Sequence, residues 1–122
     1  MRIFKNRWFA RFARREHIMD ASLREAVARA ERGLVDADLG GGLIKQRIAR
    51  EGQGRSGGYR MLLAYKTQDR AVFFYAFAKN ERGNIEPDEL LTAREIAAQW
   101  IAADANAIAR GLQEGILEEV QL

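Results

Sequence analysis

The sequence predicts an α+β domain, in which helices pack against a small, mainly antiparallel sheet in the order β-α-α-β-β-β-α-α. Two observations carry this prediction. Residues 59–66 and 71–78 read as apolar strands joined by a short polar turn over 67–70, which is typical of a hairpin. Segments with helical periodicity precede and follow this hairpin instead of alternating with its strands.

The chain begins with a short strand over 2–5, and Asn6 follows as the N-cap of a first helix. Trp8 and Phe12 are spaced four residues apart, so they share one face of that helix. We expect these aromatic rings in the core. A stacking site for nucleic-acid bases at Trp8 is the alternative.

A second helix follows, with Asp20 and Ser22 as its two candidate N-caps and Gly33 placed to end it. Residues 34–42 then predict a loop that closes on three consecutive glycines. The run lacks the Gly-Lys-Ser/Thr ending of a P-loop and the spacing of a dinucleotide-binding turn. We therefore interpret it as a turn.

Residues 43–50 form the next predicted strand, on which Lys45 and Arg47 lie two residues apart and point to the same side. Two neighbouring cations repel one another unless an anion joins them. The pair therefore indicates either an anion site or a solvent-facing edge strand protected by charge.

After a polar turn over 51–58, Arg60 enters the first strand of the hairpin. An arginine at the start of a buried strand needs a partner, and the sequence offers a carboxylate, Glu81, or a bound phosphate. The strand over 71–78 is apolar on both faces, which predicts a central strand covered on both sides.

Pro87 fits the first turn of a third helix, and Asp104 can cap a fourth. Residues 116–120 could form a last strand or a tail. A chain of 122 residues has the length of one domain. We expect a single domain over 1–122, with 103–122 as a helical extension.

The charge is distributed unevenly. The first 14 residues carry five basic side chains and no acid, and residues 45–60 carry five against one acid, whereas residues 86–122 hold eight acids and two arginines. This asymmetry suggests a face built for phosphates, although scattered surface charge would give the same counts. The sequence has no cysteine and no apolar run typical of a signal peptide or membrane span, so we expect a cytoplasmic protein.

The side chains in this sequence that could carry out catalysis are mainly cationic. His17 is the one histidine and lies at a helix end, and no G-x-S-x-G elbow occurs. What remains is a group of basic side chains: Lys45, Arg47, Arg50, Arg55, Arg60, Lys79 and Arg82. Arginines can stabilise the charge that develops when a 2′-hydroxyl attacks the neighbouring phosphate of RNA, and a lysine with a depressed pKa can transfer the proton. This chemistry requires no metal and no cofactor.

Three segments together carry a family resemblance: Arg55-Ser56-Gly57-Gly58-Tyr59-Arg60, Phe77-Ala78-Lys79-Asn80-Glu81-Arg82 and Leu39-Gly40-Gly41-Gly42-Leu43-Ile44-Lys45-Gln46-Arg47. Over roughly residues 1–103 the chain resembles the RelE/ParE superfamily of bacterial type II toxins, and most of all its HigB-type branch. The resemblance implies a toxin that cleaves mRNA in the ribosomal A site. It also implies a tight antitoxin, often a helix-turn-helix protein of the HigA type, and contact with operator DNA only through that antitoxin. It implies no membrane partner.

The resemblance also implies roles for individual residues. Arg60 matches the strand arginine that contacts the scissile phosphate, and Lys45 and Arg47 fall near the basic pair of the preceding strand. Arg82, with Lys79 beside it, falls in the basic segment after the last central strand. These five form the predicted catalytic set, and Arg50 and Arg55 are predicted RNA contacts.

This chain departs from the RelE pattern at two places. The turn between Arg47 and Arg60 is longer, and Glu86 lies near the position of a tyrosine that stacks on a base, which leaves the general acid and base unassigned. Two other functions fit the same fold. One is a ParE-like toxin that inhibits DNA gyrase, and the other is a non-catalytic module whose basic face binds an acidic partner.

Overall fold

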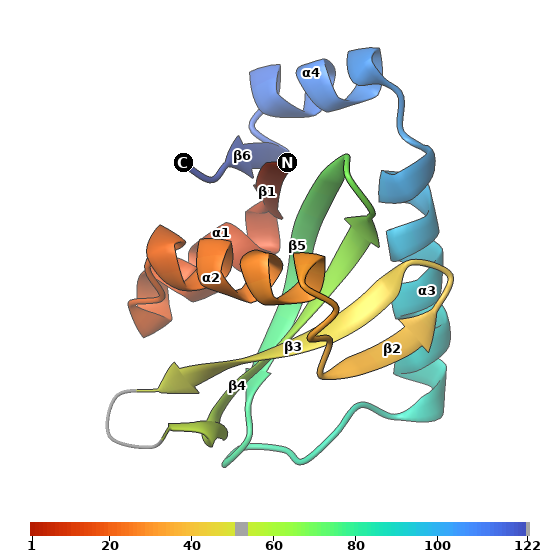
Figure 1. The fold of residues 1–122 in the computed structure, drawn as a ribbon. Coiled ribbons are helices and arrows are strands. Elements are labelled where there is room, and N and C mark those ends of the chain that lie inside the picture. The colour runs from red at the N-terminus through yellow and green to blue at the C-terminus, as the bar shows by residue number, and fades with distance from the viewer. Residues whose placement is uncertain (51–53, 122) are drawn as a thin grey trace.

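The computed structural model describes residues 1–50 and 54–121. For residues 50 and 54–57 it describes the backbone but not the side chains. Within these residues, four helices pack on a six-stranded, mostly antiparallel sheet, which confirms the predicted α+β class (Figure 1). The elements in chain order are β1 (Arg2–Asn6), α1 (Arg7–Glu16), α2 (Asp20–Glu31), β2 (Ala37–Gly40), β3 (Leu43–Arg50), β4 (Gly54–Lys66), β5 (Arg70–Ala78), α3 (Pro87–Ala102), α4 (Ala105–Gln113) and β6 (Leu117–Glu119).

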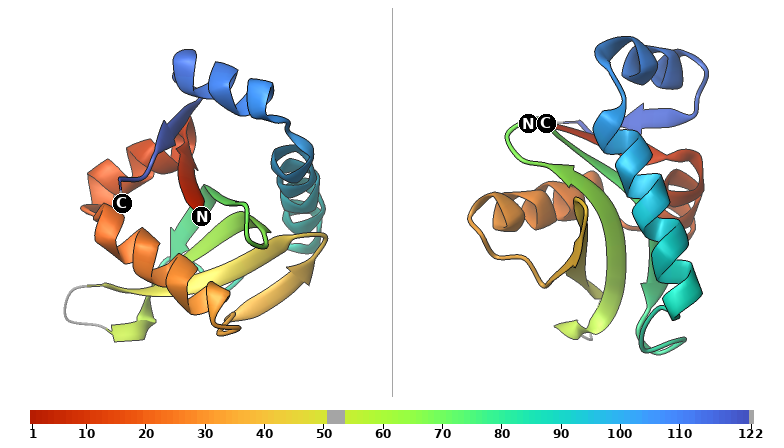
Figure 2. Two further views of the ribbon diagram at one scale, coloured as in Figure 1. Left: turned by 45° about the horizontal axis from the view of Figure 1, so that its top comes forward. Right: turned by 90° about the vertical axis from the view of Figure 1, so that its right-hand side faces the viewer.

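The sheet has the strand order β2-β3-β4-β5-β1-β6. Strands β2 to β5 form antiparallel pairs of chain neighbours, including the predicted hairpin of β4 and β5. The N-terminal strand β1 adds parallel to β5, and β6 returns antiparallel to β1, so the two ends of the chain lie close together (Figure 2). The C-terminal segment therefore contributes both a helix and a strand of the main sheet.

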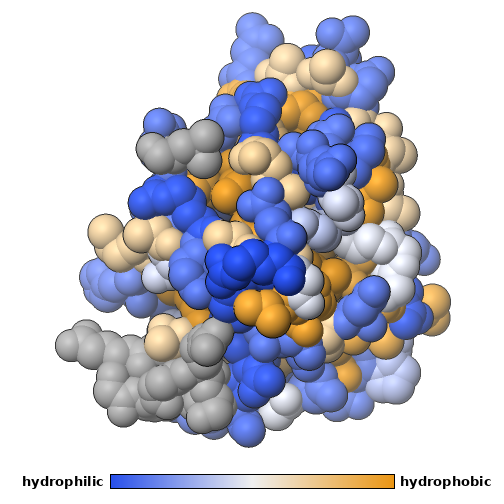
Figure 3. All heavy atoms as spheres, viewed as in Figure 1, coloured by the Kyte–Doolittle hydropathy of each residue, from blue (hydrophilic) through white to orange (hydrophobic). Residues whose placement is uncertain are grey.

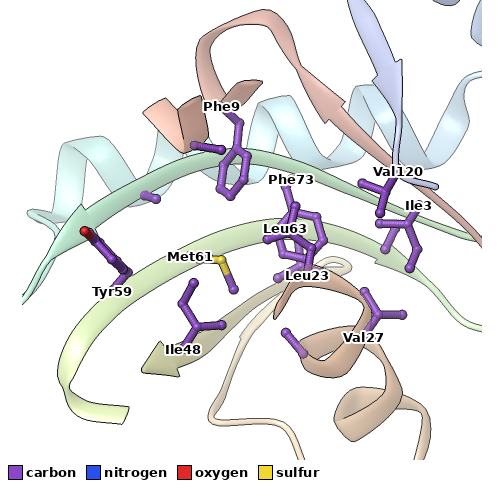
Figure 4. Packing of buried hydrophobic residues seen from close by; sticks show 14 of the residues in the cluster. Ile3, Phe9, Leu23, Val27, Ile48, Tyr59, Met61, Leu63, Phe73 and Val120 are labelled. Carbon is purple, nitrogen blue, oxygen red and sulfur yellow. The ribbon is translucent and has the colours of Figure 1, made fainter. Parts of the chain in front are cut away.

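One face of the sheet is covered by α1 and α2. Asn6 caps α1 as predicted, because its side chain accepts a hydrogen bond from the backbone N–H of Phe9. Side chains from both helices meet alternate residues of the central strands in an apolar core (Figure 4). The largest of these side chains include Phe9, Leu23, Met61, Leu63 and Phe73, each fully buried.

The opposite face of the sheet is covered by α3 and α4, as the side view of Figure 2 shows for α3. Pro87 occupies the first turn of α3, as predicted, and Glu86 and Glu89 form a capping box there. Arg70, at the start of β5, donates hydrogen bonds to the carbonyls of Trp100 and Ala103 at 2.9 and 2.6 Å. These bonds fasten the last turn of α3 to the sheet.

Three local expectations were wrong. The loop predicted over 34–42 contains the strand β2, because the buried Gln46 side chain accepts the backbone N–H of Asp36 and holds this segment beside β3. Strand β4 begins at Gly54 rather than at residue 59. The N-cap of α2 is Met19, since the carboxylate of Asp20 binds Lys5 at 3.0 Å instead of capping the helix.

The surface on the side of α2 is mainly hydrophilic, and its apolar patches are small and separated (Figure 3). No helix in the described ranges is both long enough and apolar enough to cross a membrane.

The glycine turn between β2 and β3 supplies a test of how α3 docks. Gly41 and Gly42 both have positive φ, of 63° and 85°, so an alanine at either position is strained. A Cβ at Gly41 meets nothing within 4 Å, whereas one at Gly42 lies 1.9 Å from Cδ1 of Ile101 in α3.

We predict that Gly42→Ala lowers the free energy of unfolding by about 1.5–3 kcal/mol, because the end of the Ile101 side chain must move aside and this cost adds to the backbone strain. Gly41→Ala, the matched control, should lose about 1 kcal/mol from strain alone. Urea unfolding of both variants measures the difference. Equal losses would contradict the prediction that packing holds the Ile101 side chain in place against this turn.

Candidate functional site

Three predicted site residues, Lys45, Arg47 and Arg60, lie together on the α3 side of the sheet, and we call them the cationic row. Arg47 of β3 is the direct cross-strand neighbour of Arg60 of β4, and Lys45 is the neighbour of Leu62. Leu62 belongs to the core cluster under α3, which identifies the face. Like charges directly opposite one another destabilise a sheet, and a nearby anion relieves the repulsion. Asp36, with Oδ1 3.7 Å from Nε of Arg47, supplies one such charge.

Burial differs along the cationic row. Arg60 is only 6% exposed, whereas the side chain of Arg47 is 40% exposed and Lys45 is half-buried. An anion that reaches the row therefore finds Arg60 at its floor.

The charges of the row act on one another. Burial lowers the pKa of Lys45 below its ordinary value, and the positive charges of Arg60 and Arg47 lower it further, against an opposing effect of Asp36. Burial also lowers the pKa of Arg60, and Arg47 adds to this. Lys45 is thus the side chain of the row best suited to give up a proton.

Arg82 lies on the same side of the sheet but is already bound. Its guanidinium lies 5.2 Å above the ring of Phe77, which is the cross-strand neighbour of Arg60. It donates to the carboxylate of Glu89, with Nη1 to Oε2 at 3.0 Å, and to the carbonyl of Asn84. The hydrogen bond from Arg82 lowers the pKa of Glu89 to about 2.

Of the remaining predicted residues, Lys79 is not brought into the row. Lys79 follows β5 and is exposed, and its backbone N–H donates to the carbonyl of Gly58. The side chains of Arg50 and Arg55 lie outside the part of the chain that the structure describes.

A polar network that the sequence did not predict, built around the buried Arg29 and Gln46, supports the row from the edge of β3. Asp36 Oδ2 accepts the backbone N–H of Arg47 at 2.7 Å and Nη1 of Arg29 at 3.2 Å. Arg29 is 4% exposed, and it also binds Glu25 and the carbonyl of Arg47. Gln46, wholly buried, donates to the carbonyls of helix residue Ala26 and loop residue Leu34. The one sequence signal was the polar Gln46 between two isoleucines.

The sequence suggested Glu81 as the carboxylate beside Arg60. Among the described acids, the structure instead brings Asp36 close to Arg60. The negative charge of Asp36 partly offsets the lowering of the Arg60 pKa by burial and by Arg47. Glu81 is exposed in the turn after β5.

Trp8 is only partly in the core, as it is 42% exposed. Its ring stacks on Phe12 at 5.3 Å and on Tyr75 at 4.7 Å between centroids. Contacts of this kind explain its position by packing within the protein, without a bound base.

The fold and the cationic row define a small α+β protein with cationic side chains grouped on the α3 face of its sheet. Residues 1–120 match the family model of the RelE toxin of the RelE / RelB toxin-antitoxin system. The match covers nearly the whole chain and extends beyond the segment of the sequence resemblance, so the protein belongs to the RelE toxin family. Membership implies a cognate antitoxin as partner. No curated protein matched the chain.

Asp36 allows a test of the network that supports the row. The hydrogen bonds from Arg47 and Arg29 lower the pKa of Asp36 although its burial acts in the opposite direction. A carboxylate with a lowered pKa stabilises the folded state above its unfolded pKa of about 4, and this contribution is lost as the pH falls through the folded pKa.

We predict that Asp36→Asn lowers the free energy of unfolding at pH 7 by about 2 kcal/mol, because the buried Arg29 loses a charged acceptor. The deficit should shrink as the pH falls below about 4, where the unfolded carboxylate takes up its proton, and should vanish below the lower pKa of the folded state. Urea titrations at pH 7 and pH 3 measure both effects. Asp38→Asn, two residues further on in β2 and in no ion pair among the described residues, is the control and should change stability by less than about 0.5 kcal/mol.

Proposed function

We propose that this protein is a ribosome-dependent endoribonuclease that inhibits translation by cleaving mRNA. The observation that supports the proposal most strongly is the Arg47–Arg60 cross-strand pair with Lys45 beside it. Membership of the RelE toxin family supports a toxin role for the chain as a whole.

In the proposed reaction the 2′-hydroxyl of a nucleotide attacks the adjacent phosphate, and the 5′-oxygen of the next nucleotide leaves. Arg60 at the floor of the row and Arg47 beside it hold the phosphate and stabilise its additional negative charge. The lowered pKa of Lys45 suits it to transfer a proton. Arg82 approaches the same phosphate from the side of Phe77, and the exposed Lys79 adds positive charge nearby.

The finer features of the proposal follow the family resemblance. We place the protein in the HigB-type branch, with a helix-turn-helix antitoxin of the HigA type through which the pair would bind operator DNA. The ribosome and mRNA are its cytoplasmic targets, Arg50 and Arg55 are further RNA contacts, and residues 1–122 act as one toxin domain.

We predict that Arg60→Ala slows cleavage of ribosome-bound mRNA about 100-fold or more, because the phosphate loses the donor at the floor of the row. Primer extension on a translated message measures cleavage, and a thermal melt verifies that the variant is folded. Arg11→Ala, which removes an exposed arginine of α1 on the other side of the sheet, should cleave like the wild type.

A folded Arg60→Ala variant with full activity would overturn the site. A wild-type protein that inhibits supercoiling by DNA gyrase without cutting mRNA would be a ParE-like toxin. One that does not arrest growth when expressed would instead be a non-catalytic partner-binding module.

A further inference from the structure

Arg82 is held more completely than its role as a surface cation would require. A guanidinium has five N–H donors. Nε and Nη2 of Arg82 both donate to the carbonyl of Asn84 at 3.0 Å, and Nη1 and Nη2 donate side by side to the two carboxylate oxygens of Glu89. These bonds occupy four donors and leave one N–H, on Nη1, for another acceptor.

Glu89 is itself fixed to the first turn of α3. Its Oε1 accepts the backbone N–H of Glu86 at 2.8 Å, which forms one half of the capping box. The helix that carries Glu89 buries Ala93 and Ala97 against the sheet. Because the Glu89 side chain is itself fixed to a packed helix, it can hold the Arg82 guanidinium in one orientation.

The clamp places the guanidinium where the proposed reaction needs it. Arg82 lies over Phe77, and Phe77 is the strand neighbour of Arg60 on the face of the cationic row. We propose that Glu89 is a positioning residue that orients the remaining N–H of Arg82 toward the scissile phosphate. This inference rests on the proposed function, because it assigns Glu89 an effect on RNA cleavage through Arg82.

Glu89→Gln tests the clamp with little effect on the helix. Glutamine at this position still accepts the backbone N–H of Glu86, so the capping box is kept while the charged, paired contact with Arg82 is lost. We expect kcat for cleavage of ribosome-bound mRNA to fall about 10- to 100-fold with KM nearly unchanged. Glu95→Gln makes the same charge change at an exposed position of α3 and should leave kcat unchanged.

A double-mutant cycle separates positioning from a general structural role. In an Arg82→Lys background, Glu89→Gln should cause no further loss of kcat, because the group that it orients has already been changed. An equal loss in both backgrounds would overturn the proposal, as would an unchanged kcat. An increase in kcat would show that Glu89 restrains Arg82 instead of positioning it, and would also overturn it.

Side-chain ¹⁵N NMR supplies a readout that does not depend on activity. A clamped Arg82 should give two separate Nη signals in the wild type, and they should average to one in Glu89→Gln. Averaged signals in the wild type would overturn the clamp. If the wild type does not cleave mRNA, the proposed function fails, and this measurement still decides whether Arg82 is held.

Discussion

The ion pair between the buried Arg29 and Asp36 is the contact on which the cationic row depends. Arg47 and Arg60 repel one another across β3 and β4, and β2 covers only the first residues of β3. At Arg47 the open edge of β3 is completed by side chains, since Arg29 donates to its carbonyl and Asp36 accepts its N–H. The network thus holds two arginines side by side by binding the backbone of Arg47 and, through Asp36, its guanidinium.

Much of the fold was predictable from the sequence, because local signals carry it. The hairpin of β4 and β5 follows from two apolar runs around a polar turn, and Asn6, Pro87 and Asp104 mark helix starts that the structure confirms. Strand β2 was missed because four residues have no periodicity of their own. It lies beside β3 because Gln46 binds the backbone N–H of Asp36, ten residues earlier in the chain and just before the strand, and no local pattern encodes such a contact.

The candidate site was predictable only where the alternation of side chains along a strand determines which residues share a face of the sheet. Lys45 and Arg47 share a face by their spacing alone, and the register of β3 and β4 then adds Arg60 despite the long turn between these strands. The clamp on Arg82 was not predictable, since it depends on the position of α3 against the sheet. The importance of Asp36 was not predictable either, because it also depends on contacts between elements that are distant in the chain. Its role comes from α2 and β3 meeting in space.

Membership of the RelE toxin family and the cationic row together lead to the central claim, that the α3 side of the sheet receives the mRNA. A cryo-EM structure of the protein on a ribosome tests it most directly. The A-site codon should carry 2′-O-methyl groups, which prevent attack on the phosphate. We predict the scissile phosphate within hydrogen-bond distance of the Arg60 side chain. An mRNA that contacts the α1–α2 face, or an A site without the protein, would contradict the account.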